Sequence, residues 1–115
     1  MPTKLYIAVL EDFPDFMTPT LVAHTMLGAH LAMETNPDYR YWLETSFKKC
    51  VVRVSAKEFE KIAALPGTYL GHENNTLGGM KSCAIPVPVK NAALPNVLKF
   101  AKLWKPLIGT GKDEK

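Results

Sequence analysis

The spacing of apolar residues in the first third of the chain predicts a buried strand followed by a long helix. Residues 4–10 are apolar almost without interruption, which is typical of a central strand covered on both faces. After a loop, Thr18 is suited to cap a helix, and Pro19 fits its first position, where a missing N–H costs nothing. Apolar residues at helical spacing carry this helix to about Thr35, and Pro37 follows as a stop signal.

The rest of the chain alternates between shorter elements. Ser55 and Glu58 have the spacing of a capping box and mark the start of a second helix. Pro86 and Pro88 lie late in an apolar run, where neither can donate a ladder hydrogen bond. The predicted elements are a short irregular or helical connection over 38–43, a strand over 50–54, a helix over 56–65, strands over 68–72 and 82–89, and a last helix over about 95–104.

This order of elements predicts an α/β fold. Two early strands separated by helical segments favour a mixed sheet, here of four strands, with helices on both faces. The 115 residues suffice for one domain over 1–107, and a polar tail over 108–115 follows it. No apolar run reaches about 18 residues, and residues 1–4 lead directly into the first strand. We therefore expect neither a membrane span nor a signal peptide.

Charge and cysteine usage indicate a globular, mildly basic protein. Apolar residues make up 47% of the chain and charged residues 22%, which excludes a disordered polymer, and the formal net charge is +3. Glu11, Asp12 and Asp15 gather in the loop after the first strand. Cys50 and Cys83 could pair, but their apolar surroundings and the lack of a CxxC spacing favour buried free thiols and a cytoplasmic location.

The three histidines do not have the spacing of a metal site. His24 and His30 are six positions apart on one predicted helix, so they point about 120° away from each other. With His72 they form neither an HExxH motif nor a Cys/His quartet, and we expect no metal and no cofactor. A lone helical histidine such as His24 is more often a packed residue than a catalyst. Gly28, four positions later, permits another backbone to approach the same face.

A polar loop before the strand predicted over 82–89 offers hydrogen-bonding groups. Asn74, Asn75 and Thr76 could orient a carbonyl or a water, or they could simply form a turn. The chain has no GxSxG, P-loop or GxGxxG motif, so these hydrolase, phosphate-binding and dinucleotide-binding signatures are absent from it. Neither cysteine has an adjacent base that would make it a nucleophile.

Residues 23–29, which read AHTMLGA, carry a resemblance to a known family. With the Glu-Asp-Phe triplet at 11–13 and with Thr76, they make the chain similar to the type II peptidyl-tRNA hydrolases over most of residues 4–107. These small α/β enzymes hydrolyse the ester that joins a peptide to tRNA, and their helix reads approximately AAQCAHAxLGA. The resemblance implies a three-layer α/β sandwich with a four-stranded mixed sheet, tRNA or peptidyl-tRNA as partner, and a homodimer.

The resemblance also implies roles for individual residues. His24 would help to position a water or the substrate, and Thr76 would bind the scissile carbonyl together with a neighbouring asparagine. The implied residues are His24, Thr76 and, as a third candidate, Asp12 for catalysis, and Asn74, Asn75 and Gly28 for substrate binding.

The chain departs from this family at the charged and polar groups. Met17 stands where the family has a loop lysine, and Leu21 stands where the helix has a glutamine. Residues 72–76 keep only the threonine of the family's Asp-x-Gly-Arg-Thr motif. A lysine near a tRNA end neutralises phosphate and can stabilise an oxyanion, and methionine does neither. A second hypothesis is therefore a non-catalytic or repurposed protein that binds a ligand in the same crevice.

Overall fold

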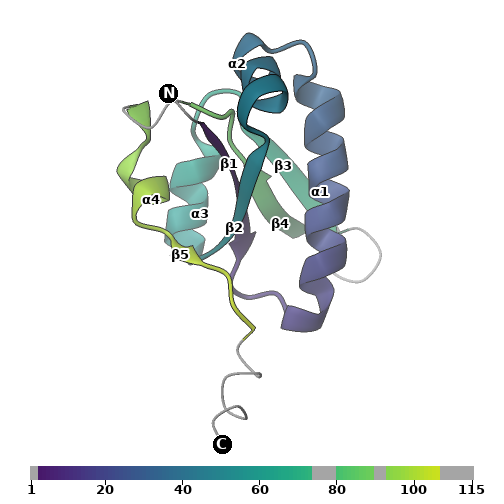
Figure 1. Cartoon of the computed structure of the whole chain (residues 1–115). Coiled ribbons are helices and arrows are strands. Elements are labelled where there is room, and N and C mark those ends of the chain that lie inside the picture. Colours follow the sequence, from purple (N-terminus) through teal and green to yellow (C-terminus); the bar gives the residue numbers. More distant parts are fainter. Residues whose placement is uncertain (1–2, 74–79, 90–92, 107–115) are drawn as a thin grey trace, which may run out of the picture.

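A mixed, open sheet of five strands forms the centre of the protein (Figure 1). The computed structural model describes residues 3–73, 80–89 and 93–106. The spatial order of the strands is β3-β4-β1-β2-β5, with β1 and β2 parallel and the other neighbours antiparallel. The strands are β1 (Lys4–Leu10), β2 (Lys48–Val54), β3 (Tyr69–Glu73), β4 (Met80–Ile85) and β5 (Lys102–Leu103).

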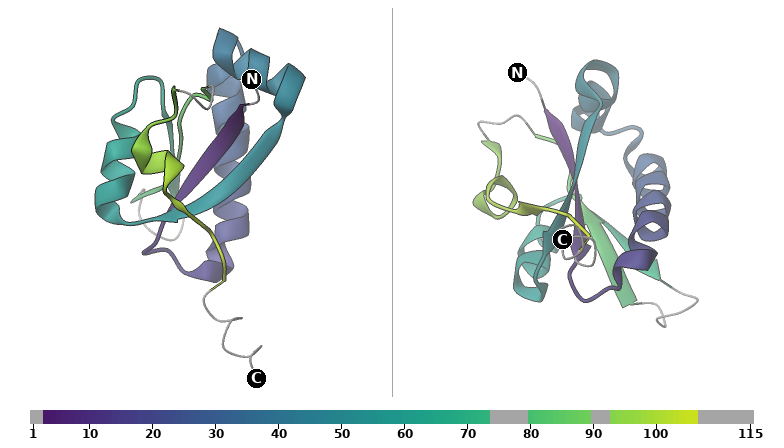
Figure 2. Two further views of the ribbon diagram at one scale, coloured as in Figure 1. Left: turned by 60° about the vertical axis from the view of Figure 1, so that its left-hand side comes forward. Right: turned by 60° about the horizontal axis from the view of Figure 1, so that its bottom comes forward.

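Helices lie on both faces of this sheet, as two further views show (Figure 2). Helix α1 covers one face, and α3 and α4 cover the other. The predicted α/β class and the mixed sheet with helices on both faces are thereby confirmed, whereas the predicted tail over 108–115 lies outside the described residues. The helical elements are the 3-10 turn η1 (Asp15–Met17), α1 (Thr18–Met33), α2 (Pro37–Tyr41), the π-helix η2 (Trp42–Ser46), α3 (Ala56–Ala63) and α4 (Asn96–Lys99).

The prediction of four strands and of a last helix over 95–104 is wrong. Helix α4 has only four residues, and the chain then runs beside β2, where residues 102–103 pair with residues 52–53 as β5. The Trp104 N–H extends this contact by donating to the Val51 carbonyl at 2.9 Å. An edge strand leaves a row of unpaired N–H and C=O groups, and pairing with β5 satisfies part of that row on β2.

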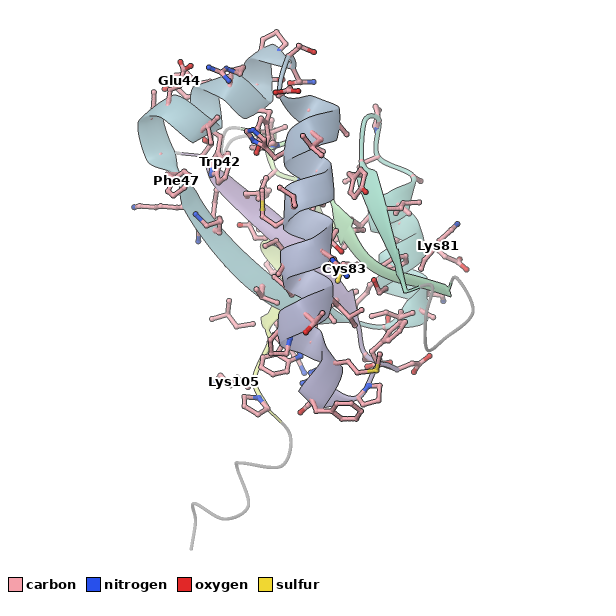
Figure 3. The ribbon with its side chains drawn as sticks, turned by 90° about the vertical axis from the view of Figure 1, so that its right-hand side faces the viewer. Trp42, Glu44, Phe47, Lys81, Cys83 and Lys105 are labelled. Carbon is pink, nitrogen blue, oxygen red and sulfur yellow. The ribbon has the colours of Figure 1, made fainter. Side chains whose placement is uncertain are left out.

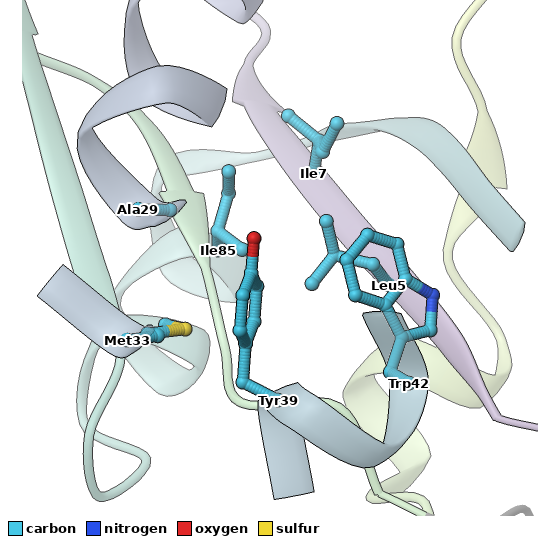
Figure 4. Close-up of a cluster of buried hydrophobic side chains, with 7 residues drawn as sticks. All are labelled: Leu5, Ile7, Ala29, Met33, Tyr39, Trp42 and Ile85. Carbon is cyan, nitrogen blue, oxygen red and sulfur yellow. The ribbon is translucent and has the colours of Figure 1, made fainter. Parts of the chain in front are cut away.

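Strand β1 is buried on both of its faces, as its apolar run predicts. Leu5 and Ile7 face the α1 side of the sheet, where they form one core cluster with Tyr39 and Trp42 (Figure 4). Ala8 belongs to a second cluster on the other side, which includes Phe59 and Ile62 of α3. A strand enclosed in this way has no freedom to shift, so it fixes where the loop after Leu10 begins.

Helix α1 begins at Thr18, and the prediction that Thr18 caps it is wrong. The N-cap is Met17, which has helical backbone angles and offers no side-chain oxygen. The Thr18 N–H donates to the Asp15 carbonyl, so η1 runs directly into α1. A backbone turn therefore supplies a hydrogen bond that a side-chain cap would otherwise provide. The Thr18 hydroxyl itself is buried and has no hydrogen-bond partner among the described residues.

Two glycines allow α1 to lie close to β3. A Cβ on Gly28 of α1 would overlap the hydroxyl end of the Tyr69 ring, and a Cβ on Gly71 of β3 would overlap the Thr25 side chain. Thr25 is buried in the interface and cannot turn away into solvent. Thr25 and Gly28 of the AHTMLGA stretch thus have a packing reason, because they set the spacing between α1 and β3.

Several local predictions from the sequence are confirmed. The capping box of α3 is formed, with the Glu58 N–H donating to Ser55 Oγ at 3.2 Å and the Ser55 N–H donating to Glu58 Oε1 at 2.8 Å. Cys50 and Cys83 are both free thiols as predicted; Cys83 is fully buried, whereas Cys50 is only partly buried. The prediction of a strand over 82–89 is only partly right, because β4 is Met80–Ile85 and ends just before Pro86. None of the helices in the described ranges is both long enough and apolar enough to cross a bilayer.

Candidate functional site

The predicted site belongs to the edge of the sheet at which β1 and β2 end. Ligand sites of α/β proteins usually lie at the carboxyl ends of parallel strands. Residues 11–17 leave β1 at this edge and enter α1, and the Glu11 N–H donates to the Val54 carbonyl at the end of β2 at 2.8 Å. Since β4 is antiparallel to both β1 and β3, β3 ends and β4 begins at the same edge.

His24 lies on the outer face of α1 and is exposed. It stands six residues after Thr18, which places it about 9 Å along the helix from the first turn. No hydrogen bond or ring contact links its imidazole to another residue in the described part of the chain. Most lone helical histidines pack in the core, but His24 does not. Its ring is therefore available to a ligand.

Gly28 lies one turn beyond His24 and points toward β3. Its hydrogen faces the Tyr69 ring at a distance that leaves no room for a side chain. This contact gives Gly28 a structural role in the spacing of α1 and β3. Its assignment as a substrate-binding residue stays a prediction.

Asp12 is exposed in the loop that leaves β1. It shares the edge of the sheet with the N-terminal half of α1, but no contact joins it to His24 among the described residues. Asn74, Asn75 and Thr76 lie outside the described residues, so their predicted roles remain predictions. The strand ends on either side of them, Glu73 and Met80, lie at this edge.

The positions of the family's lysine and glutamine are occupied by packing residues. Leu21 is buried in a cluster with Val9 and Phe13, and Met17 is half-buried against the same cluster. Both side chains are part of the contact that holds the start of α1 on the sheet. Neither offers charge or a hydrogen bond to a ligand.

Arg53 brings a cation to this edge that sequence reasoning did not single out. Its Nη2 lies 3.1 Å from Asp15 Oδ1 and donates to the Lys105 carbonyl at 2.6 Å. Its guanidinium also lies 5.1 Å from the centre of the Trp104 ring. The Arg53 and Asp15 side chains are only 15% and 17% exposed, so this ion pair is shielded from solvent more than most surface pairs are. The available signal was one charged residue at the carboxyl end of the Val-rich run 51–54.

In the described part of the chain, the thiols and acidic groups form no site suited to metal or thiol chemistry. Burial raises the pKa of the Cys50 and Cys83 thiols above the ordinary value, so both remain protonated and weakly nucleophilic at neutral pH. Within the described ranges, no three His, Cys, Asp or Glu side chains lie close enough together to hold a metal ion. This edge thus presents the exposed imidazole of His24, exposed carboxylates and the Arg53 guanidinium, which Asp15 and the Lys105 carbonyl hold in place.

The chain was compared with models of protein families and with curated protein sequences. It matches no family model and no curated sequence.

Proposed function

We propose that the protein is a divergent hydrolase that cleaves the ester between a peptide and tRNA, in the manner of the type II peptidyl-tRNA hydrolases. The observation that carries this proposal is the setting of residues 23–29. This stretch lies on the helix that follows the first strand of a mixed α/β sheet, packs Thr25 and Gly28 against β3, and leaves His24 exposed. The resemblance implies a site on α1, and the exposure of His24 on that helix supports this proposal.

The proposed reaction adds one water across the ester. The water oxygen attacks the ester carbonyl, the bond to the ribose oxygen breaks, and a free carboxylic acid and a tRNA hydroxyl are formed. His24 would position or deprotonate the water, and Thr76 with Asn74 or Asn75 would donate to the carbonyl oxygen as it gains charge. Asp12, exposed beside the start of α1, would orient the water or the imidazole.

Arg53 supports a phosphate-bearing substrate at this edge. Its side chain is fixed by Asp15 and the Lys105 carbonyl. The exposed Lys102 of β5 is paired with Arg53 across the two strands, and Lys105 is also exposed. Cations near a tRNA end offset phosphate charge, which is the task that Met17 cannot perform. We propose that β2 and β5 supply this charge in place of the loop.

The packing of Met17 and Leu21 favours a second candidate, a protein that binds tRNA or another ligand at this edge without cleaving it. Both side chains take part in the core, so replacing a lysine and a glutamine there removes polar groups from the site and leaves the fold intact. Losing one group that stabilises a developing oxyanion costs on the order of a hundredfold or more in rate.

The decisive experiment follows peptide release from a peptidyl-tRNA over time with the wild type, His24→Ala and a control variant, Lys61→Ala. Lys61 is exposed on α3, on the opposite face of the sheet. We expect the wild type and the control to hydrolyse the ester and His24→Ala to be about a hundredfold slower. Salt-dependent tRNA binding without hydrolysis would favour the second candidate. Neither binding nor hydrolysis by the wild type would overturn both.

A further inference from the structure

A cavity of about 360 Å³ opens on the α1 side of the sheet, toward the N-terminal ends of β1 and β2. Figure 3 shows Trp42 and Phe47 at this end of the molecule and Lys105 at the other, beyond the carboxyl end of β2. The cavity thus lies at the opposite end of β2 from Arg53, and its wall on α1 begins at Ala23, next to His24. Its walls come from Ala23, Met26 and Leu27 of α1, and from Tyr39, Trp42 and Phe47 opposite them.

The body of the cavity is apolar. The polar groups of its walls already have partners: His30 Nδ1 and the Tyr39 hydroxyl share a hydrogen bond at 2.8 Å, and Trp42 Nε1 donates to the Lys48 carbonyl at 2.7 Å. The rings of Trp42 and Phe47 stack with their centres 5.5 Å apart and their planes 22° from parallel. Such a surface offers little to an uncharged polar ligand, and it favours an aromatic or branched apolar group.

One cation stands at the rim of this apolar space. Lys49 Nζ lies 3.5 Å from the centre of the Phe47 ring and 5.5 Å from that of Trp42, and it donates to the Phe47 carbonyl at 2.9 Å. These contacts hold the ammonium in place but use only one of its three N–H donors for a hydrogen bond. In the described part of the chain, no carboxylate pairs with Lys49. The rim therefore presents a positioned positive charge.

The backbone that builds the rim is unusual. Residues 42–46 form a π-helix, a rare turn that often accompanies functional sites. Phe47 follows with φ of 60°, a left-handed conformation that favours glycine and that a bulky residue adopts only when its surroundings hold it there. The result is a large aromatic side chain that is 57% exposed at the mouth of an apolar cavity.

We propose that this cavity binds a small organic acid, with an aromatic or branched apolar body between α1 and the Trp42–Phe47 pair and its carboxylate on Lys49 Nζ. Complementary charge and surface select this occupant: the walls are apolar, and Lys49, the one unpaired charge among the described residues that line the cavity, is positive. The volume lies at the lower end of the range for small-molecule sites, which suits a ligand of about one aromatic ring system. This site does not depend on the function proposed above.

The test uses indole-3-propionic acid and its uncharged amide as probes, without any tRNA. Each is titrated into isotopically labelled protein, and the shifts of the Trp42 indole N–H and of backbone amides around the cavity are followed by NMR. We expect saturable shifts that centre on Trp42, Phe47 and Leu27, with the acid binding about tenfold more tightly than the amide. No saturable shift at millimolar acid, or shifts centred on Arg53 and Trp104 instead, would overturn the proposal.

Two variants separate the charge from the cavity. Lys49→Met removes the ammonium and should make acid and amide bind equally, whereas Lys48→Met, at the neighbouring exposed lysine, should leave both affinities unchanged. Leu27→Asp places a carboxylate at the wall and should abolish acid binding; Leu27 is 65% exposed, so the fold should tolerate it. An acid affinity that survives both Lys49→Met and Leu27→Asp would rule this site out.

Discussion

Helix α1 meets the rest of the protein along two flanks that are built in different ways. On the flank toward β3, Gly28 and Gly71 remove side chains from the contact, and Tyr69 and Thr25 fill the space that is left. On the flank toward η2, large side chains hold the two elements apart and leave a cavity of about 360 Å³. The same helix thus has one flank without spare volume and one with room for a ligand.

The contrast between the two flanks shows that residues 23–29 support the fold more directly than they support an activity. Thr25 and Gly28 of AHTMLGA are explained by the close approach of α1 and β3 on the first flank. Packing on either flank does not account for His24, because its side chain faces solvent. Packing thus accounts for Thr25 and Gly28 of this stretch, and it does not account for His24.

The largest expected effect is on the tight flank, at Gly71. Replacing it with alanine drives a Cβ into the buried, β-branched Thr25 side chain, and we expect a loss of about 2 to 3 kcal/mol in the free energy of unfolding. Urea unfolding followed by circular dichroism measures this loss. The double variant Thr25→Ala/Gly71→Ala should be less destabilised than the two single losses added together. Simple additivity would show that this contact is not the cause.

Gly28→Ala should have a smaller effect on the same flank. Its added Cβ meets the far end of the Tyr69 side chain, which is half-buried and can move, and alanine gains about 1 kcal/mol of helix propensity over glycine. We expect a net loss of about 1 kcal/mol in the same unfolding measurement. In a Tyr69→Ala background the substitution should become stabilising. An equal loss in both backgrounds would contradict the proposed clash.

Tyr39→Phe tests the loose flank, where it removes the hydrogen bond to His30. We expect a loss of roughly 0.5 to 1 kcal/mol at pH 7. Burial raises the pKa of Tyr39 above its ordinary 10.0, an effect that the nearby Arg40 only partly opposes. The folded state thus disfavours the phenolate. The resulting stability is complete below about pH 10 and is lost as pH rises through the raised folded pKa.

Unfolding free energies of the wild type and Tyr39→Phe between pH 7 and pH 11 check both parts of this prediction. The wild type should lose stability more steeply above pH 10, so the gap between the two proteins should close there. Tyr6 and the two thiols, whose pKa values burial also raises, titrate alike in both proteins and cancel in the comparison. Parallel curves over the whole range would contradict the assignment to Tyr39.

Leu31→Ser should have the smallest effect, because the solvent-facing side of α1 belongs to neither flank. Leu31 is 63% exposed, and we expect its replacement to change the unfolding free energy by less than about 0.5 kcal/mol. The measurement should be paired with size-exclusion chromatography of both proteins. A large loss of stability together with a smaller particle size would show that a second copy of the chain covers this face.

The sequence predicted the elements whose signals are local. The apolar run of β1 and the Ser55–Glu58 capping box are properties of a few neighbouring residues, and both appear in the structure as expected. The end of the chain was misassigned because β5 forms only where β2 offers an unpaired edge, which is information from a segment about 50 residues away. No periodicity within 95–104 contains that edge.

The residues of the candidate site also differ in whether local sequence could predict them. His24 and Asp12 could be chosen from short motifs, and both are exposed as a site requires. The Arg53–Asp15 pair joins positions 38 residues apart, so its existence depends on the parallel pairing of β1 and β2 and on the path of η1. The cavity beside Phe47 was not predicted either, because the π-helix and the left-handed phenylalanine that form its rim have no recognised sequence signature here.

The short strand β5 has a consequence for how the protein behaves at high concentration. It protects only part of the outer edge of β2, and residues 48–50 have no neighbouring strand on that side within the described ranges. Two of those three residues are exposed lysines, whose charge opposes the approach of an identical strand from another molecule. The outer edge of β2 is thus paired with β5 at its carboxyl end and carries repulsive lysines at its N-terminal end. Both features disfavour assembly into continuous intermolecular sheets.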